Sequence, residues 1–262
     1  MTIPAAREAV LRQTADILLT ARRTASPIPD LPADLHPANE AEAFAVQDAI
    51  VEAYRPIGGY KVGARGPEHQ PFFAPMPAAW MGENGALFRG DNHRLRGVEA
   101  EICFRIGTAL PPRDVPYTRD EVFGAIESCH PALEILESAF TDPTVVSREC
   151  MLADLQMHGG FVAGPAVRDW QTIDWSQEQV TLSADGAIRV ENTGSNPGGH
   201  DLIRLLVYMA NEGSKRTGGL KRGDWITTGS WTGVTWTSHG TEVVANFSHA
   251  GRVSLQFATE KL

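Results

Sequence analysis

Apolar side chains follow two different periods along this chain. A largely apolar stripe at positions 10, 11, 14, 17, 18 and 21 has helical spacing, and a second helix is predicted from about Glu40 to Tyr54. The proline-rich stretch 26–37 separates the two helices. From Val98 onward the apolar residues take every second position, through residue 106, which predicts a half-buried strand.

The later part of the chain is predicted to consist mainly of strands. They lie at 132–138, near 161–162, at 180–190, and at 224–230, 241–248 and 251–257. A helix at 118–129 is expected to stop at His130-Pro131, and another follows Asp201. Helices first and antiparallel strands afterwards indicate an α+β fold. The sequence contains neither G-x-G-x-x-G nor a P-loop motif, so nucleotide binding is not supported.

Length and charge limit the function classes. A chain of 262 residues with 42% hydrophobic content can bury a large core. We predict a small N-terminal α/β region at 1–75 and a β-rich catalytic domain at 76–262. The net charge of −9 disfavours the phosphate contacts on which nucleic-acid binding depends, so nucleic acid is not an expected partner.

The N-terminus lacks the basic start and apolar core of a secretory signal, and no segment approaches the ~18 apolar residues of a membrane span. A cytoplasmic protein with no membrane partner is therefore expected. Cys103, Cys129 and Cys150 show no paired metal spacing, which predicts free thiols.

Two carboxylates lie on the polar face of the strand that starts at Val98. Glu99 and Glu101 are two residues apart and therefore project from the same face. Like charges held side by side repel each other unless a cation neutralises them, and a hard divalent metal is the natural partner. The alternative is that both are solvent-facing residues paired with Arg94, Arg96 or Arg105.

Five segments of the chain together match the pattern of a known family. They are Gly59-Tyr-Lys-Val-Gly63, Val98-Glu-Ala-Glu-Ile-Cys-Phe104, Pro131-Ala-Leu-Glu-Ile-Leu-Glu-Ser138, Gly159-Gly-Phe-Val-Ala-Gly164 and Gly223-Asp-Trp-Ile-Thr-Thr-Gly-Ser230. In this order and spacing they resemble the fumarylacetoacetate hydrolase superfamily, and most of all its branch of 2-keto-4-pentenoate hydratases and 4-oxalocrotonate decarboxylases. The similarity covers nearly the whole chain. It implies a mixed β-sheet roll or barrel with a small helical N-terminal region, and a homo-oligomer.

The resemblance implies a set of site residues. It implies that Glu99, Glu101 and Glu134 bind Mg²⁺ or Mn²⁺, that Lys61 binds or protonates the substrate, and that the turn at Ser230 contacts the substrate. Three carboxylates on adjoining strands also suit octahedral Mg²⁺ better than zinc on chemical grounds. A lysine near a dication is expected to have a lowered pKa.

The chain departs from the hydratase pattern at two places. Residues 70–75 read Gln-Pro-Phe-Phe-Ala-Pro where hydratases carry Q-P-D-F-G, and residues 153–159 read Ala-Asp-Leu-Gln-Met-His-Gly where they carry A-D-N-A-S-S-G. His158 is therefore a candidate acid or base, and Gln156 a candidate for orienting water or substrate. The alternative for His158 is a structural role in a turn. His130 is a candidate for orienting Glu134.

These observations predict a metal-dependent lyase acting on a small 2-oxo acid, of the kind used in the breakdown of aromatic compounds. Hydration of a 2-hydroxy-2,4-dienoate through a metal-stabilised enolate is the first choice. Decarboxylation of an oxalocrotonate-like diacid and C–C hydrolysis of an acylpyruvate are the enzymatic alternatives. Because the Asp and the two serines of the hydratase pattern are absent, a non-catalytic 2-oxo acid- or metal-binding protein also stays open.

Overall fold

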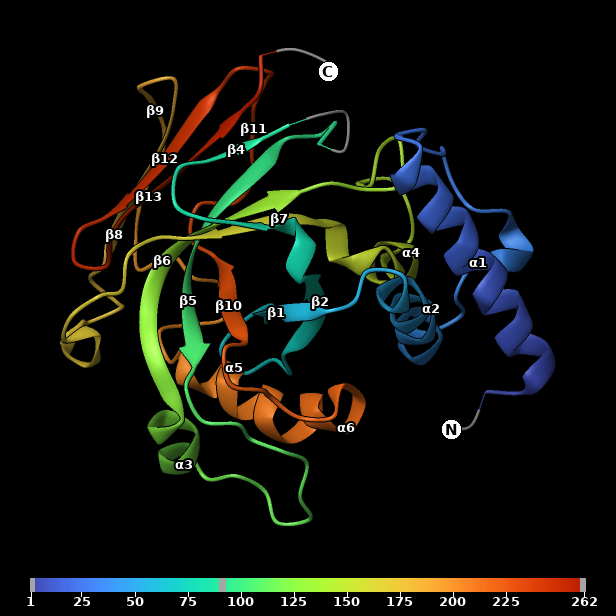
Figure 1. Cartoon of the computed structure of the whole chain (residues 1–262), viewed down its shortest axis with the longest axis horizontal. Coiled ribbons are helices and arrows are strands. Elements are labelled where there is room, and N and C mark those ends of the chain that lie inside the picture. Colours follow the sequence, from blue (N-terminus) through green and yellow to red (C-terminus); the bar gives the residue numbers. More distant parts are fainter. Residues whose placement is uncertain (1–2, 90–92, 260–262) are drawn as a thin grey trace.

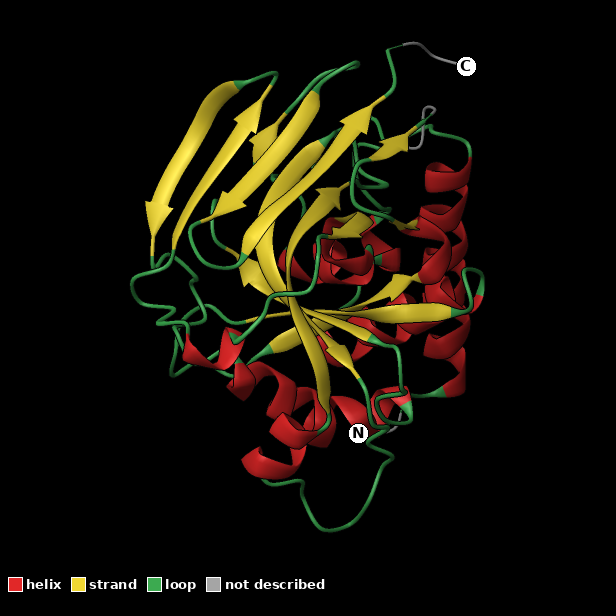
Figure 2. Ribbon diagram, turned by 60° about the vertical axis from the view of Figure 1, so that its left-hand side comes forward, coloured by secondary structure: helices red, strands yellow, loops and turns green. Residues whose placement is uncertain are grey.

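Two β-sheets form the centre of the molecule, and helices cover one side and one end of the larger sheet (Figures 1 and 2). The computed structural model describes residues 3–89 and 93–259. Its helices are α1 (Ala5–Arg23), α2 (Glu40–Glu52), α3 (Arg119–Gly124), α4 (Arg148–Ala153), α5 (Ile203–Tyr208) and α6 (Ser214–Thr217), with single turns at Ala33–Leu35, Ala78–Trp80, Leu155–Met157 and Trp170–Thr172 and a π-turn at Met209–Gly213.

The larger sheet has eight strands in the order β2-β1-β10-β5-β6-β7-β3, with β11 pairing on β5, and the second sheet has five in the order β4-β13-β12-β8-β9. Most neighbours are antiparallel, whereas β1 and β10, β3 and β7, and β4 and β13 are parallel. The strands are β1 (Ile57–Gly63), β2 (Phe72–Pro77), β3 (Met81–Gly82), β4 (Ala86–Phe88), β5 (Gly97–Ile106), β6 (Ile126–Leu136), β7 (His158–Ala163), β8 (Gln179–Ala184), β9 (Ala187–Thr193), β10 (Trp225–Ser230), β11 (Thr235–Trp236), β12 (Glu242–Phe247) and β13 (Gly251–Phe257).

Alternation along β5 divides its side chains between two environments. Val98, Ile102 and the other even-numbered residues of the strand are fully buried in the main core, together with Leu133 of β6 and Val243 and Val253 of the second sheet. The odd-numbered side chains face the opposite side, where Cys103 packs in a separate small cluster. The predicted alternation is thereby confirmed, and it places Glu99 and Glu101 away from the apolar core.

The helix predicted at 118–129 is wrong beyond its first half. The side chains of Thr118 and Glu121 form a capping box that starts α3, but the helix ends at Gly124. Residues from Ile126 onward pair with β5 instead, and the pairing continues through His130 and Pro131 without a break in the strand. Long-range pairing in a central strand outweighs the local helical pattern here.

The mixed α+β architecture is confirmed, and the segment predicted at 180–190 is a hairpin that turns at Asp185-Gly186, both with positive φ. The division of the chain at residue 75 stays a prediction; that position lies inside β2, which pairs with β1 in the main sheet.

The three cysteines are free and buried in the described ranges. None of the described helices is long and apolar enough to cross a membrane.

His93 provides a test of the packing between the sheets. Its ring lies against Phe88 and Phe257, its Nε2 lies 3.2 Å from the carbonyl oxygen of Gly159, and burial lowers its pKa from 6.5 to about 4. Between pH 6.5 and about 4 His93 is protonated in the unfolded chain but neutral in the folded protein, so the folded state loses stability as the pH falls. We expect this difference in pKa to reduce the free energy of unfolding by about 2 kcal/mol when the pH falls from 7 to 5.

Chemical denaturation of the wild type and of His93→Phe at both pH values checks this expectation. Phenylalanine keeps the aromatic contacts but cannot titrate, so the loss of stability on acidification is expected to be smaller in the variant by about 2 kcal/mol. An equal loss in both proteins would contradict the assignment.

Candidate metal centre and active site

Three carboxylates meet on the polar side of the larger sheet. Glu99 and Glu134 are direct partners in the β5–β6 register, and Glu101 is the next residue on the same face of β5. Oxygen atoms of all three lie within 4.8 Å of one another. Glu101 and Glu134 are buried, with 2% and 0% exposure, whereas Glu99 is partly exposed. The structure thus brings together the three residues that the sequence predicts as metal ligands.

A single lysine supplies positive charge to this group. Lys61 of β1 reaches it across β10, and its Nζ lies 2.6 Å from Oε1 of Glu134 and donates to the carbonyl oxygen of Gln156 at 3.1 Å. Burial alone would lower the pKa of Lys61, but the attraction of Glu134, Glu99 and Glu101 is stronger and raises it. The sequence predicts a lowered pKa for Lys61 with a dication bound beside it, and that prediction does not apply to the group without its ion.

The alternative in which the glutamates face solvent and are neutralised by arginines is wrong for Glu101 and Glu134. Glu101 and Glu134 are not solvent-facing. Arg105 pairs with Glu127 at 3.5 Å, and Arg94 donates to the carbonyl oxygen of Phe140 at 2.8 Å.

The three glutamates have different surroundings, which shift their pKa values in different directions. Burial, with repulsion from Glu134, raises the pKa of Glu99 and raises that of Glu101 well above its usual range. Burial acts on Glu134 too, but the nearby Lys61 and a hydrogen bond from His158 outweigh it and lower its pKa. Among the described residues, Lys61 is the cation that acts on all three acids, which leaves a deficit of positive charge that a divalent ion would fill.

The donor set fits a hard divalent metal. Oε2 of Glu134 is buried and makes no hydrogen bond within the part of the chain that the structure describes, so a coordination position is open on it. Glu101 is held in place because its Oε2 accepts hydrogen bonds from the Thr227 hydroxyl and, at 2.9 Å, from the Gly229 N–H. All candidate ligand atoms are oxygens, as Mg²⁺ and Mn²⁺ prefer.

His158 adjoins the metal-ligand candidates. It is the first residue of β7 and is fully buried, with its Nδ1 2.9 Å from Oε1 of Glu134. Its Nε2 has no hydrogen-bond partner among the described residues, and its ring stacks on Trp80 at 5.9 Å. Burial lowers its pKa, so the neutral imidazole is favoured.

The turn before His158 carries Gln156. Its side-chain amide donates to the carbonyl oxygen of Phe73 at 2.6 Å, and its own carbonyl oxygen accepts from Lys61. Gln156 therefore orients Lys61 through its backbone, and its role as a substrate ligand stays a prediction. Ser230 lies opposite Glu101 in the β10–β5 register, and its buried hydroxyl is close enough to Glu99 to act on the pKa of that carboxyl, which places it beside the candidate ligands.

The proposed link between His130 and Glu134 is wrong. Nδ1 of His130 lies 2.8 Å from the carbonyl oxygen of Gly164, and Nε2 lies 2.7 Å from the hydroxyl of Ser128. Both ring nitrogens of His130 are therefore engaged by Gly164 and Ser128. The histidine that contacts Glu134 is His158.

Sequence reasoning missed Thr227 and Trp80. Alternation along β10 gives a signal for Thr227, because Ile226 before it packs in the main core and Thr227 must then face the opposite side of the sheet. Trp80 lies in the single turn after β2, and no periodic pattern indicates its contact with His158.

Asp30, His36 and Cys150 form a second group whose donor atoms lie close together. Nε2 of His36 lies 3.0 Å from the carbonyl oxygen of Leu31 and 3.3 Å from Asp30. The thiol makes this set softer than the glutamate group and unsuited to Mg²⁺.

Comparison with known proteins places these observations in context. No protein-family model matches the chain. A 4-oxalocrotonate decarboxylase from Pseudomonas sp is 29% identical over 183 residues, which cover 69% of this chain and 66% of that relative, slightly under two thirds of its length.

Solved structures share the fold. A 4-oxalocrotonate decarboxylase from Pseudomonas putida G7, complexed with magnesium and adipate, has a TM-score of 0.81 at 21% identity and covers 98% of this chain and 99% of its own. The same enzyme complexed with calcium and acetate gives a TM-score of 0.80 at 21% identity, with the same two coverages. A 2-hydroxyhepta-2,4-diene-1,7-dioate isomerase from Mycobacterium marinum gives 0.57 at 18% identity over 78% of this chain and 76% of its own. The fold of this chain is therefore that of these enzymes.

Proposed function

We propose that this chain, whose similarity to the fumarylacetoacetate hydrolase superfamily the comparisons confirm, is a divalent-metal-dependent enzyme that acts on a small 2-oxo acid. The observation that carries the proposal is the group of Glu99, Glu101 and Glu134, with one oxygen of Glu134 buried and unpartnered in the described chain. The magnesium and calcium in the similar decarboxylase structures support a divalent ion here.

Among the possible reactions we favour decarboxylation of an oxalocrotonate-like diacid over hydration of a dienoate. The relative identified by sequence is a 4-oxalocrotonate decarboxylase, and so is the enzyme whose structure matches nearly the whole chain. The departures from the hydratase pattern count against hydration, because His158 stands where hydratases have a serine, next to a metal-ligand candidate. Hydration remains the second candidate.

Glu99, Glu101 and Glu134 would hold the metal ion, which when bound supplies a Lewis acid for the negative charge that develops on the keto oxygen of the substrate. The hydroxyl of Ser230, which lies beside Glu99, would donate to the substrate carboxylate once the metal ion takes up the charge of that glutamate. Exclusion of water by the surrounding buried side chains strengthens these contacts.

We assign proton transfer to the side chains of Lys61 and His158. Loss of carbon dioxide breaks a C–C bond and leaves its electron pair on the substrate, and a proton must then be delivered to carbon. The Nζ of Lys61 carries protons at neutral pH and lies at the edge of the carboxylate group. His158, whose Nδ1–H donates to Glu134, presents an unprotonated Nε2 that can accept a proton.

Incubation of the purified protein and Mg²⁺ with each substrate class tests the proposal. We expect 4-oxalocrotonate to be consumed with release of one carbon dioxide per molecule, and 2-hydroxy-2,4-pentadienoate and an acylpyruvate to be consumed far more slowly. Fast loss of the dienoate alone would favour hydration. Absence of turnover of all three, with Mg²⁺-dependent binding of oxalate, would leave the non-catalytic alternative.

A further inference from the structure

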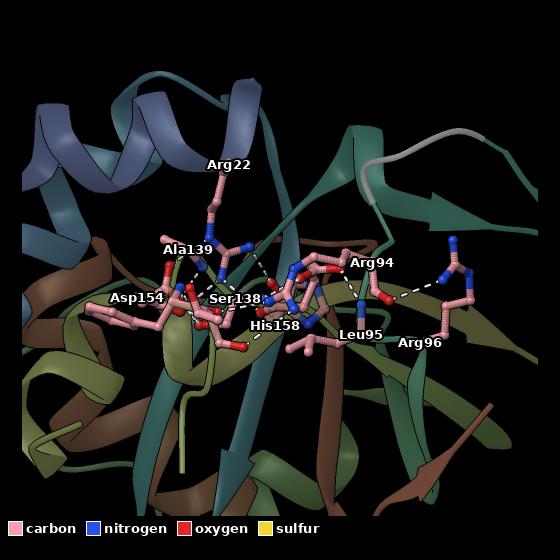
Figure 3. A network of polar contacts seen from close by, with 11 residues as sticks. Arg22, Arg94, Leu95, Arg96, Ser138, Ala139, Asp154 and His158 are labelled. Carbon is pink, nitrogen blue, oxygen red and sulfur yellow. Dashed lines mark hydrogen bonds and ion pairs between the residues drawn. The ribbon is translucent and has the colours of Figure 1, made fainter. Parts of the chain in front are cut away.

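We propose that Arg22, on the N-terminal helix, is a positioning residue for this site: it holds the turn that aligns Gln156 and His158 with the candidate catalytic groups (Figure 3). The inference rests on the proposed function for its kinetic consequences, but its structural part does not. Arg22 lies in the last turn of α1, more than 130 residues before the turn at 155–157 in sequence.

The guanidinium group of Arg22 spans the turn from one end to the other. Its Nε donates to Oδ1 of Asp154 at 2.6 Å and its Nη2 to the carbonyl oxygen of Asp154 at 2.9 Å, just before the turn. Its Nη1 donates to the carbonyl oxygen of His158 at 2.9 Å, just after it, and Nη2 also reaches the carbonyl oxygen of Glu137 at 3.0 Å. Only the planar guanidinium can make these directed bonds together.

The turn needs such support because its backbone is unfavourable. Leu155, Gln156 and Met157 have φ values of +53°, +52° and +63°, in the left-handed region that residues with a Cβ avoid. Three such residues in succession persist only where surrounding contacts hold them. The result of this geometry is functional: the carbonyl oxygen of Gln156 accepts from Lys61, and the next strand begins with His158 against Glu134.

Two further contacts connect Arg22 to the same groups. Its guanidinium lies 5.5 Å from the centre of the Trp80 ring, and the same ring stacks on the imidazole of His158. Its partner Asp154 also accepts from the hydroxyl of Ser138 at 2.7 Å and from the N–H of Ala139 at 2.8 Å, both just beyond β6, which carries Glu134. Figure 3 shows Arg22 descending from α1 onto Asp154, Ser138 and His158.

The ion pair is buried, which decides the choice of variant. The side chains of Arg22 and Asp154 are 5% and 1% exposed, so removal of one charge alone would leave the other buried and unpaired. Arg22→Lys keeps the charge beside Asp154 but cannot also reach the carbonyl oxygens of Glu137 and His158. The double variant Arg22→Gln with Asp154→Asn removes both charges and serves as a second test if the lysine variant does not fold.

Hydrogen exchange measured by mass spectrometry tests the structural part on the protein without metal or substrate. We expect the amides of 155–159 to exchange at least about tenfold faster in Arg22→Lys than in the wild type, while β5 and β6 keep their protection. The matched control is Arg23→Lys, since Arg23 is exposed and its described contact is the ring of Tyr54 at 5.7 Å. Unchanged exchange at 155–159 in both Arg22 variants would overturn the proposal.

Steady-state kinetics distinguish a positioning role of Arg22 from a general contribution of this residue to the stability of the fold. With the substrate that the enzyme accepts, Arg22→Lys is expected to lower kcat by about 10- to 100-fold with KM changed less than about threefold. In a His158→Ala background the same change is expected to have a smaller further effect on kcat, because only the alignment of Gln156 with Lys61 is left to lose. Equal losses in both backgrounds would contradict positioning through His158. If no 2-oxo acid is turned over, the proposed function fails while the exchange measurement still decides the role of Arg22.

Discussion

Replacing Glu101 by glutamine is expected to lower kcat/KM by about 10³-fold or more, equivalent to about 4 kcal/mol of lost transition-state stabilisation. The amide has the shape of the carboxylate and can still accept hydrogen bonds from Thr227 and Gly229, so the local structure is preserved. It lacks the charge that holds a dication. Calorimetric titration with Mg²⁺ is expected to show a matching loss of affinity.

The thermal stability of Glu101→Gln without metal separates this effect from damage to the fold. Repulsion among the three acids decreases in the variant, so its Tm in a chelator is expected to equal or exceed that of the wild type. Glu127→Gln is the matched control, because Glu127 is exposed and lies on the same strand as Glu134. Undiminished Mg²⁺ binding by Glu101→Gln would remove this residue from the site.

The second large effect is expected from Lys61→Met. Lys61 is the cation that contacts Glu134, and loss of a buried partner of this kind costs about 3–5 kcal/mol. Without metal the variant is therefore expected to melt well below the wild type. A dication supplies the missing charge, so Mg²⁺ is expected to raise the Tm of Lys61→Met more than that of the wild type. Its kcat is expected to remain at least about 10²-fold low, because the proton donor is absent.

Melting curves with and without Mg²⁺, for this variant and for Lys215→Met, make the comparison. Lys215 has a side chain 70% exposed and pairs with Glu212 on one helix, so its loss is expected to change neither Tm nor the response to metal. A Tm of Lys61→Met equal to that of the wild type in a chelator would show that the lysine does not balance the carboxylates.

The parts of the site that the sequence predicts are those that depend on local periodicity. Glu99 and Glu101 follow from the alternation of β5, and that pattern is visible without any partner strand. The assignments of Glu134 and Lys61 depended on resemblance, because their proximity to β5 is set by strand order in the sheet. Apolar periodicity says which face of a strand is buried but not which strands are neighbours.

Other features lay outside what local patterns can indicate. The helix predicted to extend through Cys129 is cut short by pairing with β5, a contact between residues more than 20 positions apart. The bond between Arg22 and Asp154 joins the first helix to the middle of the chain. The left-handed turn at Gln156 contains no glycine that would mark it. Such contacts are fixed by tertiary packing, so the sequence showed His158 only as a candidate.

The central claim is that Glu99, Glu101 and Glu134 hold one divalent ion at which a 2-oxo acid reacts. Anomalous diffraction from crystals grown with Mn²⁺ and oxalate tests it most directly. The predicted result is a strong peak with oxygens of all three carboxylates at about 2.0–2.3 Å and with oxalate on the same ion. A peak at Asp30, His36 and Cys150 alone, or none beside the glutamates at saturating Mn²⁺, would contradict the account.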